Sequence, residues 1–278
     1  MQDIGTTFRG LHVPGDPFVL ANAWDAGSTK VLTALGAEAI GTTSSGHAFT
    51  LGLPDMGHVS RDQAMAHAED IVAATYLPVS GDFENGYGAA PETVAETIRL
   101  AGEIGLAGCS IEDTDMPGTD AYDFDLAVER IRAAVDASRQ VGRDFVLVAR
   151  ADGVMNGAYD LDEALRRIRA FDEAGADCLY VPQPGTPEDQ KHVCAATSKP
   201  VNALATGSFA NLARTDFATL GVGRISLGSG LARTVQATLV QAARSILSDG
   251  DFSDLLGAIP GSDIEALLLG DATPEETL

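Results

Sequence analysis

The stretch Ala174-Gly-Ala-Asp-Cys-Leu-Tyr-Val181 recurs in altered form at 35–42 (LGAEAIGT), 104–111 (IGLAGCSI) and 220–227 (LGVGRISL). Each copy places a glycine after an amphipathic segment and before a short apolar run. Glycine is common where a helix ends, because it adopts a left-handed backbone conformation without strain. The four copies therefore predict a repeated joint that leads from a helix into a buried strand.

The rest of the chain shows the same alternation. Eight short apolar runs are expected to be strands, at 18–21, 39–42, 79–82, 108–112, 145–150, 178–181, 201–204 and 224–227. Segments with apolar residues three and four apart are expected to be helices, near 27–35, 61–74, 92–104, 125–139, 161–174, 187–196, 208–219 and 231–248. Continuously apolar strands indicate a parallel sheet covered by helices, and eight such units close a barrel.

The predicted fold is an α/β fold of the (β/α)8 TIM-barrel type over residues 1–250, and an open doubly wound sheet is the alternative. Residues 251–278 are expected to form a short C-terminal helical extension, with a helix near 263–269, and not a separate domain.

Composition excludes several classes of protein. Three scattered cysteines are too few for a disulfide framework or a zinc site. No apolar run is long enough to cross a membrane, and the first residues lack the basic start and apolar stretch of a secretion signal, so we expect a cytoplasmic protein. A net charge of −22 opposes binding to nucleic acid or to anionic membranes. An acidic surface with only three lysines also suits a saline environment, which remains a hypothesis.

Acidic residues follow two neighbouring predicted strands. Asp82 and Glu84 lie two apart at the end of the third strand, and Glu112 ends the fourth. Carboxylates gathered at a barrel mouth repel one another unless a cation lies among them, and oxygen ligands favour Mg²⁺ or Mn²⁺. Solvated loop acids in a very acidic protein are the alternative. We favour the metal site, with Asp55 as a group that acts on the metal through water.

Other candidates lie at the same predicted mouth. Arg150 ends the fifth strand and can bind a substrate carboxylate, form an ion pair with Glu112, or do both. The loop after the second strand, Thr43-Ser44-Ser45-Gly46-His47, offers amides and hydroxyls to an anion. His47 is a candidate acid or base, and a hydrogen-bonded loop histidine is the alternative. No lysine is placed inside the barrel, so imine chemistry is not expected.

With these residues placed, the chain resembles the isocitrate lyase/phosphoenolpyruvate mutase superfamily over nearly all of 17–248. The matching phrases are "ANAWDAGSTKVLTALGAEAIGTTSSG", "GDFENGYG", "GCSIEDT", "VARADG" and "DEALRRIRAFDEAGAD". Glu84 stands where the family usually has a second aspartate.

The resemblance implies a barrel of the phosphoenolpyruvate/pyruvate type, in which Mg²⁺ is held by Asp82, Glu84 and Glu112. It implies that Arg150 binds and polarises the substrate and that Glu112 and Asp55 act at the metal. The candidates for proton transfer are Tyr87, His47, Asp115 and Asp120. The resemblance implies that the substrate, a small carboxylate, contacts Trp24, Asp25, Ser45, Gly46, His47 and Arg150; Asn202 in the seventh predicted strand is a further binding candidate. A homotetramer that exchanges its eighth helix between barrels is also implied.

The loop after Glu112 departs from the two best-known subtypes. It reads Asp113-Thr-Asp-Met-Pro-Gly-Thr-Asp120, without the Lys-x-Cys-Gly-His segment of the lyases or the loop lysines of the mutases. The leading interpretation is a Mg²⁺-dependent lyase, similar to methylisocitrate lyase, that cleaves a C–C bond of a 2-hydroxy or 2-oxo carboxylate through an enolate. Alternatives are C–P chemistry as in phosphoenolpyruvate mutase or phosphonopyruvate hydrolase, an oxaloacetate decarboxylase or hydrolase, and a barrel that binds a metabolite without turnover.

Overall fold

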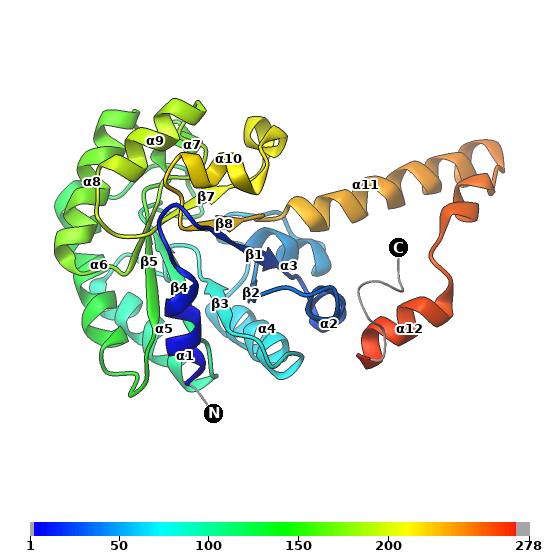
Figure 1. The fold of residues 1–278 in the computed structure, drawn as a ribbon, viewed down its shortest axis with the longest axis horizontal. Coiled ribbons are helices and arrows are strands. Elements are labelled where there is room, and N and C mark those ends of the chain that lie inside the picture. Colours follow the sequence, from blue (N-terminus) through cyan, green and yellow to red (C-terminus); the bar gives the residue numbers. More distant parts are fainter. Residues whose placement is uncertain (1–2, 271–278) are drawn as a thin grey trace.

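A computed structural model describes residues 3–270 and shows eight parallel strands closed into a barrel in chain order (Figure 1). Strand β1 pairs with β2 on one side and with β8 on the other, which closes the sheet. The predicted barrel is therefore confirmed, and the open sheet is excluded. The strands are β1 (Phe18–Asn22), β2 (Ala39–Gly41), β3 (Val79–Asp82), β4 (Gly108–Glu112), β5 (Val146–Arg150), β6 (Cys178–Tyr180), β7 (Val201–Leu204) and β8 (Arg224–Ser226).

Helices surround the barrel close to the predicted positions. They are α2 (Ala26–Ala34), α4 (Arg61–Ala73), α5 (Pro91–Glu103), α6 (Phe124–Ser138), α8 (Leu161–Ala174), α9 (Pro187–Ala195), α10 (Arg214–Thr219) and α11 (Gly230–Arg244). The segment predicted as one helix at 208–219 divides into a 3₁₀ turn, Gly207–Asn211, and α10. Three short helices were not predicted: α1 (Ile4–Leu11), α3 (Ser44–Thr50) and α7 (Gly153–Asn156).

The repeated joints have the expected geometry. Gly175 ends α8 with a φ of 104°, and Gly36, Gly105 and Gly221 have φ values of 87°, 95° and 86°. These values lie in the left-handed region that side chains with a Cβ rarely adopt. The glycines thus turn each helix back into the next strand.

Alternate strand residues face the surrounding helices and the barrel interior. Ile40, Leu147 and Leu179 pack outward in the main core, whereas Leu20 and Val148 pack inside the barrel. Below them, α1 covers the end of the barrel at which the strands begin.

Helix α1 closes that end with an aromatic contact. Phe8 is fully buried, and its ring lies 6.0 Å from that of Phe18 in an edge-to-face arrangement. Gly5 allows the approach, because a Cβ there would lie 1.8 Å from the carbonyl oxygen of Asp144.

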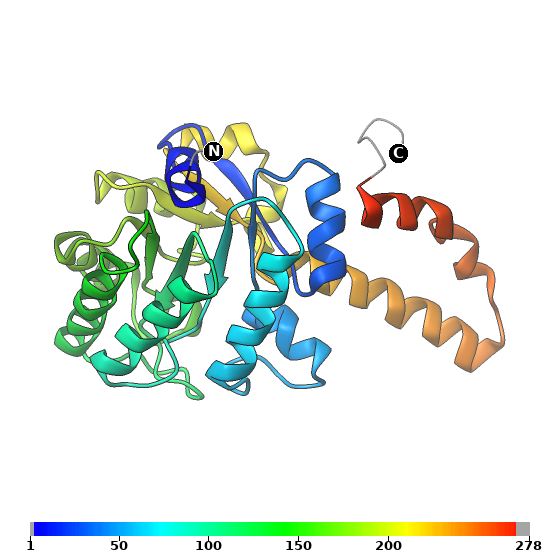
Figure 2. The ribbon, with the colours of Figure 1, turned by 90° about the horizontal axis from the view of Figure 1, so that it is seen from below.

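The C-terminal segment leaves the barrel. Helix α11 points away from it, continues through the turns Ser245–Asp249 and Ser253–Gly257, and is followed by α12 (Gly261–Leu269), which returns to α2 (Figures 1 and 2). A helix within 263–269 is thus confirmed, while 271–278 of the predicted extension lie outside the described residues. Within 3–270, none of the helices combines the length and apolar character that crossing a membrane requires.

Candidate functional site

The candidate site is a cavity of about 220 Å³ at the ends of the strands. It runs from Asp55 and Arg233 at the mouth to Leu20 and Arg224 inside the barrel. Active sites of this fold are found at this face, where the loops that follow the strands meet.

Arg150 lies at the centre of the site and binds three carboxylates. Its Nη1 is 2.9 Å from Asp82, and its Nη2 is 2.9 Å from Glu112 and 2.5 Å from Asp152. Glu112 is next to Arg150 in the register of β4 and β5, which explains the predicted ion pair. Burial lowers the pKa of the guanidinium, but the three carboxylates together raise it well above its ordinary value. Arg150 is therefore a permanent positive charge.

Asp82 is held by the start of α3. Its Oδ2 accepts hydrogen bonds from the Ser44 backbone N–H at 3.1 Å and from the Ser44 hydroxyl at 2.9 Å. The Thr42 hydroxyl accepts a bond from the Asp82 N–H at 2.7 Å. Because α3 begins at Ser44, this helix presents its N-terminus to the carboxylate, which is a favourable place for negative charge.

Glu84 and Asp55 form the acidic side of the mouth. The Gly57 N–H donates to Glu84 Oε1 at 3.0 Å, while Glu84 Oε2 is buried without a hydrogen-bond partner within residues 3–270. Burial, with the nearby charges of Asp82 and Asp55, raises the pKa of Glu84 to about 7. Burial likewise raises the pKa of Asp55. Neither carboxyl group forms an ion pair within residues 3–270, although the charge of Arg150 partly offsets the rise in both pKa values.

Whether these acids suit a magnesium ion can be judged from their arrangement. Within residues 3–270, no three His, Cys, Asp or Glu side chains form a direct metal cage. Mg²⁺ usually keeps several waters and needs only one or two carboxylates. The orphaned Glu84 oxygen and the mutual repulsion of Asp55, Asp82 and Glu84 fit a hydrated ion of this kind. Glu112 is instead bound to Arg150, which favours an indirect contact.

Two of the four candidates for proton transfer, His47 and Tyr87, lie beside the mouth. The rings of His47 and His67 stack with centroids 3.8 Å apart, and burial lowers the pKa of His47 to about 4. His47 is thus neutral near pH 7. Burial and the charge of Glu84 raise the pKa of Tyr87 well above its ordinary value, so its phenol keeps its proton. Tyr87 and Glu84 also line a neighbouring hollow of about 640 Å³ that Asp115 of the following loop reaches.

The remaining predicted binding residues occupy different places. Ser45 lines the cavity and Asn202 lies inside the barrel, where its amide donates to Ser226 at 2.8 Å. Gly46 serves close packing, since a Cβ there would lie 3.0 Å from Trp24 Cβ. Asp25 is exposed and caps α2 through the Ser28 N–H at 2.6 Å. Asp25 therefore has a structural role in this conformation.

Several site residues were not predicted from the sequence. Asp152 is fully buried and holds Arg150, and its own N–H donates to Asp113 at 2.9 Å. Asp113 is bound in turn by Tyr159 at 2.7 Å and Arg167 at 2.9 Å. An aspartate two residues after the strand-ending arginine was the available signal for Asp152. Ser44 belongs to the loop expected to offer amides and hydroxyls to an anion, and it offers them to Asp82. Arg224 carried no distinct signal.

Backbone strain is concentrated at this face. Four non-glycine residues of the described chain have left-handed φ values: Met56 (73°), Glu84 (45°), Tyr87 (65°) and Gln183 (44°). All four lie in connections between a strand and the next helix of the barrel, Met56 after the short α3. Such conformations cost energy, and they tend to persist where function requires a side chain in a fixed place.

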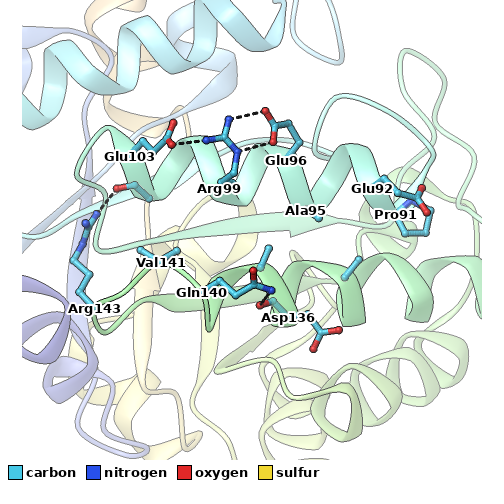
Figure 3. Close-up of a pocket in the computed structure, with 13 residues that line it drawn as sticks. Pro91, Glu92, Ala95, Glu96, Arg99, Glu103, Asp136, Gln140, Val141 and Arg143 are labelled. Atoms are coloured by element: carbon cyan, nitrogen blue, oxygen red, sulfur yellow. Dashed lines mark hydrogen bonds and ion pairs between the residues drawn. The ribbon is translucent and has the colours of Figure 1, made fainter.

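A larger hollow, of about 730 Å³, lies outside the barrel between α5 and α6 (Figure 3). Its polar lining includes the exposed ion pairs of Arg99 with Glu96 and Glu103. Exposed pairs of this kind contribute little energy. The groups suited to chemistry are in the barrel cavity and not here.

Comparison with known proteins gives a consistent result. A family model described as phosphoenolpyruvate phosphomutase matches residues 8–247. A Burkholderia cenocepacia protein, named only as a lyase/mutase, has a crystal structure with a TM-score of 0.90 and 43% identity over 94% of both chains.

Two relatives have more specific names. The 2,3-dimethylmalate lyase of Eubacterium barkeri is 34% identical over 201 residues, which is 69% of this chain and 65% of that protein. The 2-methylisocitrate lyase of Shewanella oneidensis is 26% identical over 92% of this chain and 89% of that protein. Since the family match spans nearly the whole barrel, the chain belongs to the phosphoenolpyruvate phosphomutase family, within the isocitrate lyase/phosphoenolpyruvate mutase superfamily.

Proposed function

We propose that this protein is a Mg²⁺-dependent lyase that cleaves a C–C bond of a small 2-hydroxy or 2-oxo carboxylate. The observation that carries the proposal is the cluster of Arg150 with Asp82, Glu112 and Asp152 at a cavity that Asp55 also lines. The names of the dimethylmalate and methylisocitrate lyases support the reaction class.

In the proposed cleavage of a C–C bond, negative charge develops on an oxygen of the departing enolate. A base takes the proton of a 2-hydroxyl group, the neighbouring C–C bond breaks, and its electron pair leaves as an enolate that a donor then protonates. When bound near Asp82, Glu84 and Asp55, Mg²⁺ supplies positive charge for the oxygen that becomes negative. Arg150 lies in the same cavity, with its orientation fixed by Asp152, and acts on the same charge.

Proton transfer is proposed to involve groups at the mouth. Tyr87 keeps its proton and lies beside the hollow that Asp115 lines, so it is a candidate donor to the enolate. His47 is neutral but stacked against His67, which leaves it less free to reach a substrate.

The test is a panel of hydroxy acids, oxo acids, oxaloacetate and phosphonopyruvate supplied with Mg²⁺. Release of pyruvate or glyoxylate from substrates with a cleavable C–C bond supports the proposal. Phosphate from phosphonopyruvate indicates C–P chemistry instead, and turnover of oxaloacetate alone indicates a decarboxylase or hydrolase. Binding without turnover of any compound indicates a metabolite-binding barrel.

We also propose that the protein is a homo-oligomer in which α11 covers a neighbouring barrel. Within the described residues, Ala232 is the one buried residue of α11. The arm beyond it exposes large apolar side chains, including Leu247 at 84% and Leu256 at 89%. An unpartnered apolar surface of this kind is typical of an interface between subunits.

A further inference from the structure

Arg224 is a second arginine inside the barrel, and within residues 3–270 it has no ion-pair partner. It begins β8, where it is paired in register with Phe18 and Asn202. Its side chain is only 5% exposed and lines the cavity. Its Nε and Nη1 are buried without a hydrogen-bond partner, and no carboxylate within residues 3–270 forms an ion pair with it.

Arg150 lines the same cavity but, unlike Arg224, forms ion pairs within the described chain. Three carboxylates surround Arg150 at 2.5–2.9 Å, so its positive charge is already balanced by the protein. Arg150 and the proposed Mg²⁺ therefore serve the oxygen at the reacting centre, whereas Arg224, which has no ion-pair partner within residues 3–270, is available for a further anionic group. A buried cation without a partner is costly, and burial accordingly lowers the pKa of Arg224.

The surroundings of Arg224 combine the Phe8 ring, whose centre is 6.0 Å from the guanidinium carbon, with polar atoms where barrels of this fold usually hold branched apolar residues. Ser80 Oγ, Asn202 Oδ1 and His12 Nε2 are also buried without partners in the described chain. His12 does not supply a competing charge, because burial and the nearby Arg224 lower its pKa to about 3. Within residues 3–270, the barrel interior thus contains several unpaired polar atoms besides those of Arg224.

We propose that Arg224 binds a second carboxylate of the substrate, which makes the substrate a small hydroxy dicarboxylate. This inference rests on the proposed lyase function. An enolate leaving group is stabilised when its carbon carries a carboxylate, so a second carboxylate at the neighbouring carbon makes a 2-hydroxy acid cleavable. A planar guanidinium with free N–H groups binds such a group through two hydrogen bonds.

Binding of malate and lactate tests the proposal, because these 2-hydroxy acids differ in the second carboxylate. Calorimetry with Mg²⁺ present is done on wild type, Arg224→Met, Arg224→Lys and the control Arg99→Met, which removes an exposed arginine outside the barrel that pairs with Glu96 and Glu103. We expect wild type and Arg99→Met to bind malate about tenfold or more tightly than lactate, as a charge-assisted hydrogen bond implies. Arg224→Met should lose this preference and keep its affinity for lactate, and Arg224→Lys should keep part of it.

Thermal unfolding without ligand separates binding from a structural role. Removal of an uncompensated buried charge should leave the melting temperature of Arg224→Met unchanged or higher, whereas a structural arginine would lower it. If Arg224→Met does not fold, the partial preference of Arg224→Lys is the deciding measurement.

Three results overturn the proposal: no preference for malate in wild type, an intact preference in Arg224→Met, or a site filled by chloride alone. The last is seen as chloride-dependent stabilisation that Arg224→Met lacks, without any carboxylate preference. Because binding needs no turnover, an Arg224-dependent preference together with an inactive substrate panel would refute the lyase function and leave the carboxylate site standing.

Discussion

Arg150 and Asp152 are two residues apart in the chain, and their side chains form a doubly bonded pair: Nε is 3.1 Å from Oδ1 and Nη2 is 2.5 Å from Oδ2. Asp152 is fully buried and touches the guanidinium on the edge that faces away from Asp82. The pair therefore sets the direction in which Arg150 presents its remaining N–H groups.

Asp152→Asn should weaken this orientation without changing the size of the side chain. We expect kcat/KM to fall about ten- to a hundredfold, the value of one charge-assisted hydrogen bond. Steady-state kinetics on the substrate found in the panel is the measurement. Asp144→Asn, which alters an ion pair with Arg9 at the opposite end of the barrel, should retain activity. Equal activity in both variants would contradict the role of Asp152.

Removal of the metal should abolish turnover, and Asp82→Asn should weaken the response to Mg²⁺. We expect the Mg²⁺ concentration for half-maximal activity to rise about tenfold or more, because a charged oxygen ligand is lost. Asp25→Asn is the matched control, since Asp25 caps α2 and should affect stability only. Unchanged Mg²⁺ affinity in Asp82→Asn would remove the metal assignment.

Two glycines of α1 should respond in opposite ways to the same substitution. Gly5→Ala places a Cβ 1.8 Å from the Asp144 carbonyl oxygen, so α1 must shift, and we expect a loss of about 1–3 kcal/mol. Gly10→Ala meets no atom within 4 Å and should raise stability by about 1 kcal/mol through helix propensity. Urea unfolding measures both, and a similar effect of the two would show that α1 does not dock as described.

His12 should make the protein less stable in acid. Burial and Arg224 lower its folded pKa to about 3, below the ordinary 6.5, so between these values the unfolded chain binds one proton more. The stability from this group is complete above pH 6.5 and is lost as pH falls toward 3, by about 1.4 kcal/mol per pH unit. Urea unfolding at pH 4.5 and 5.5 gives the change in the free energy of unfolding with pH. This change should be smaller in His12→Asn than in wild type, by the equivalent of about one bound proton. The same change in both proteins would contradict this origin.

The exposed arm should control assembly. Leu256→Asp places a charge on a residue that is 89% exposed in the single chain, and we expect a smaller particle by light scattering. Tyr76→Asp, at a barrel residue that is 81% exposed, is the control and should keep the wild-type size. A wild-type protein that is already monomeric would refute the proposed exchange of α11.

The strands were predictable because each is a short, largely apolar run that follows a predicted helix or turn, and four of them come shortly after a glycine that ends a helix. The boundaries of β3, β4 and β7 agree with the structure to the residue. Helices α1 and α3 were missed, since α1 has eight residues and α3 has a Ser-Ser-Gly start that is typical of a loop. Their positions are determined by tertiary packing of Phe8 and by the bonds between Ser44 and Asp82.

The site was predictable where acids and Arg150 end strands, because the fold alone brings strand ends together. It was not predictable where a side chain depends on neighbours distant in sequence. Asp25 follows Trp24 in a motif that implies a pocket, yet in the structure it caps a helix. Arg224 follows a glycine at a helix-to-strand joint, and only the closed barrel shows that it faces inward.

Helix α1 closes the end of the barrel opposite the entrance, and this closure affects the order in which the products of a cleavage reaction leave. Phe8, Phe18 and Val146 are each at most 1% exposed, so the end of the barrel below the cavity is sealed. Both fragments of a cleaved molecule must then depart through the entrance that the intact molecule used. The fragment nearer the entrance leaves first, and the deeper one, released last, is the product expected to compete with incoming substrate.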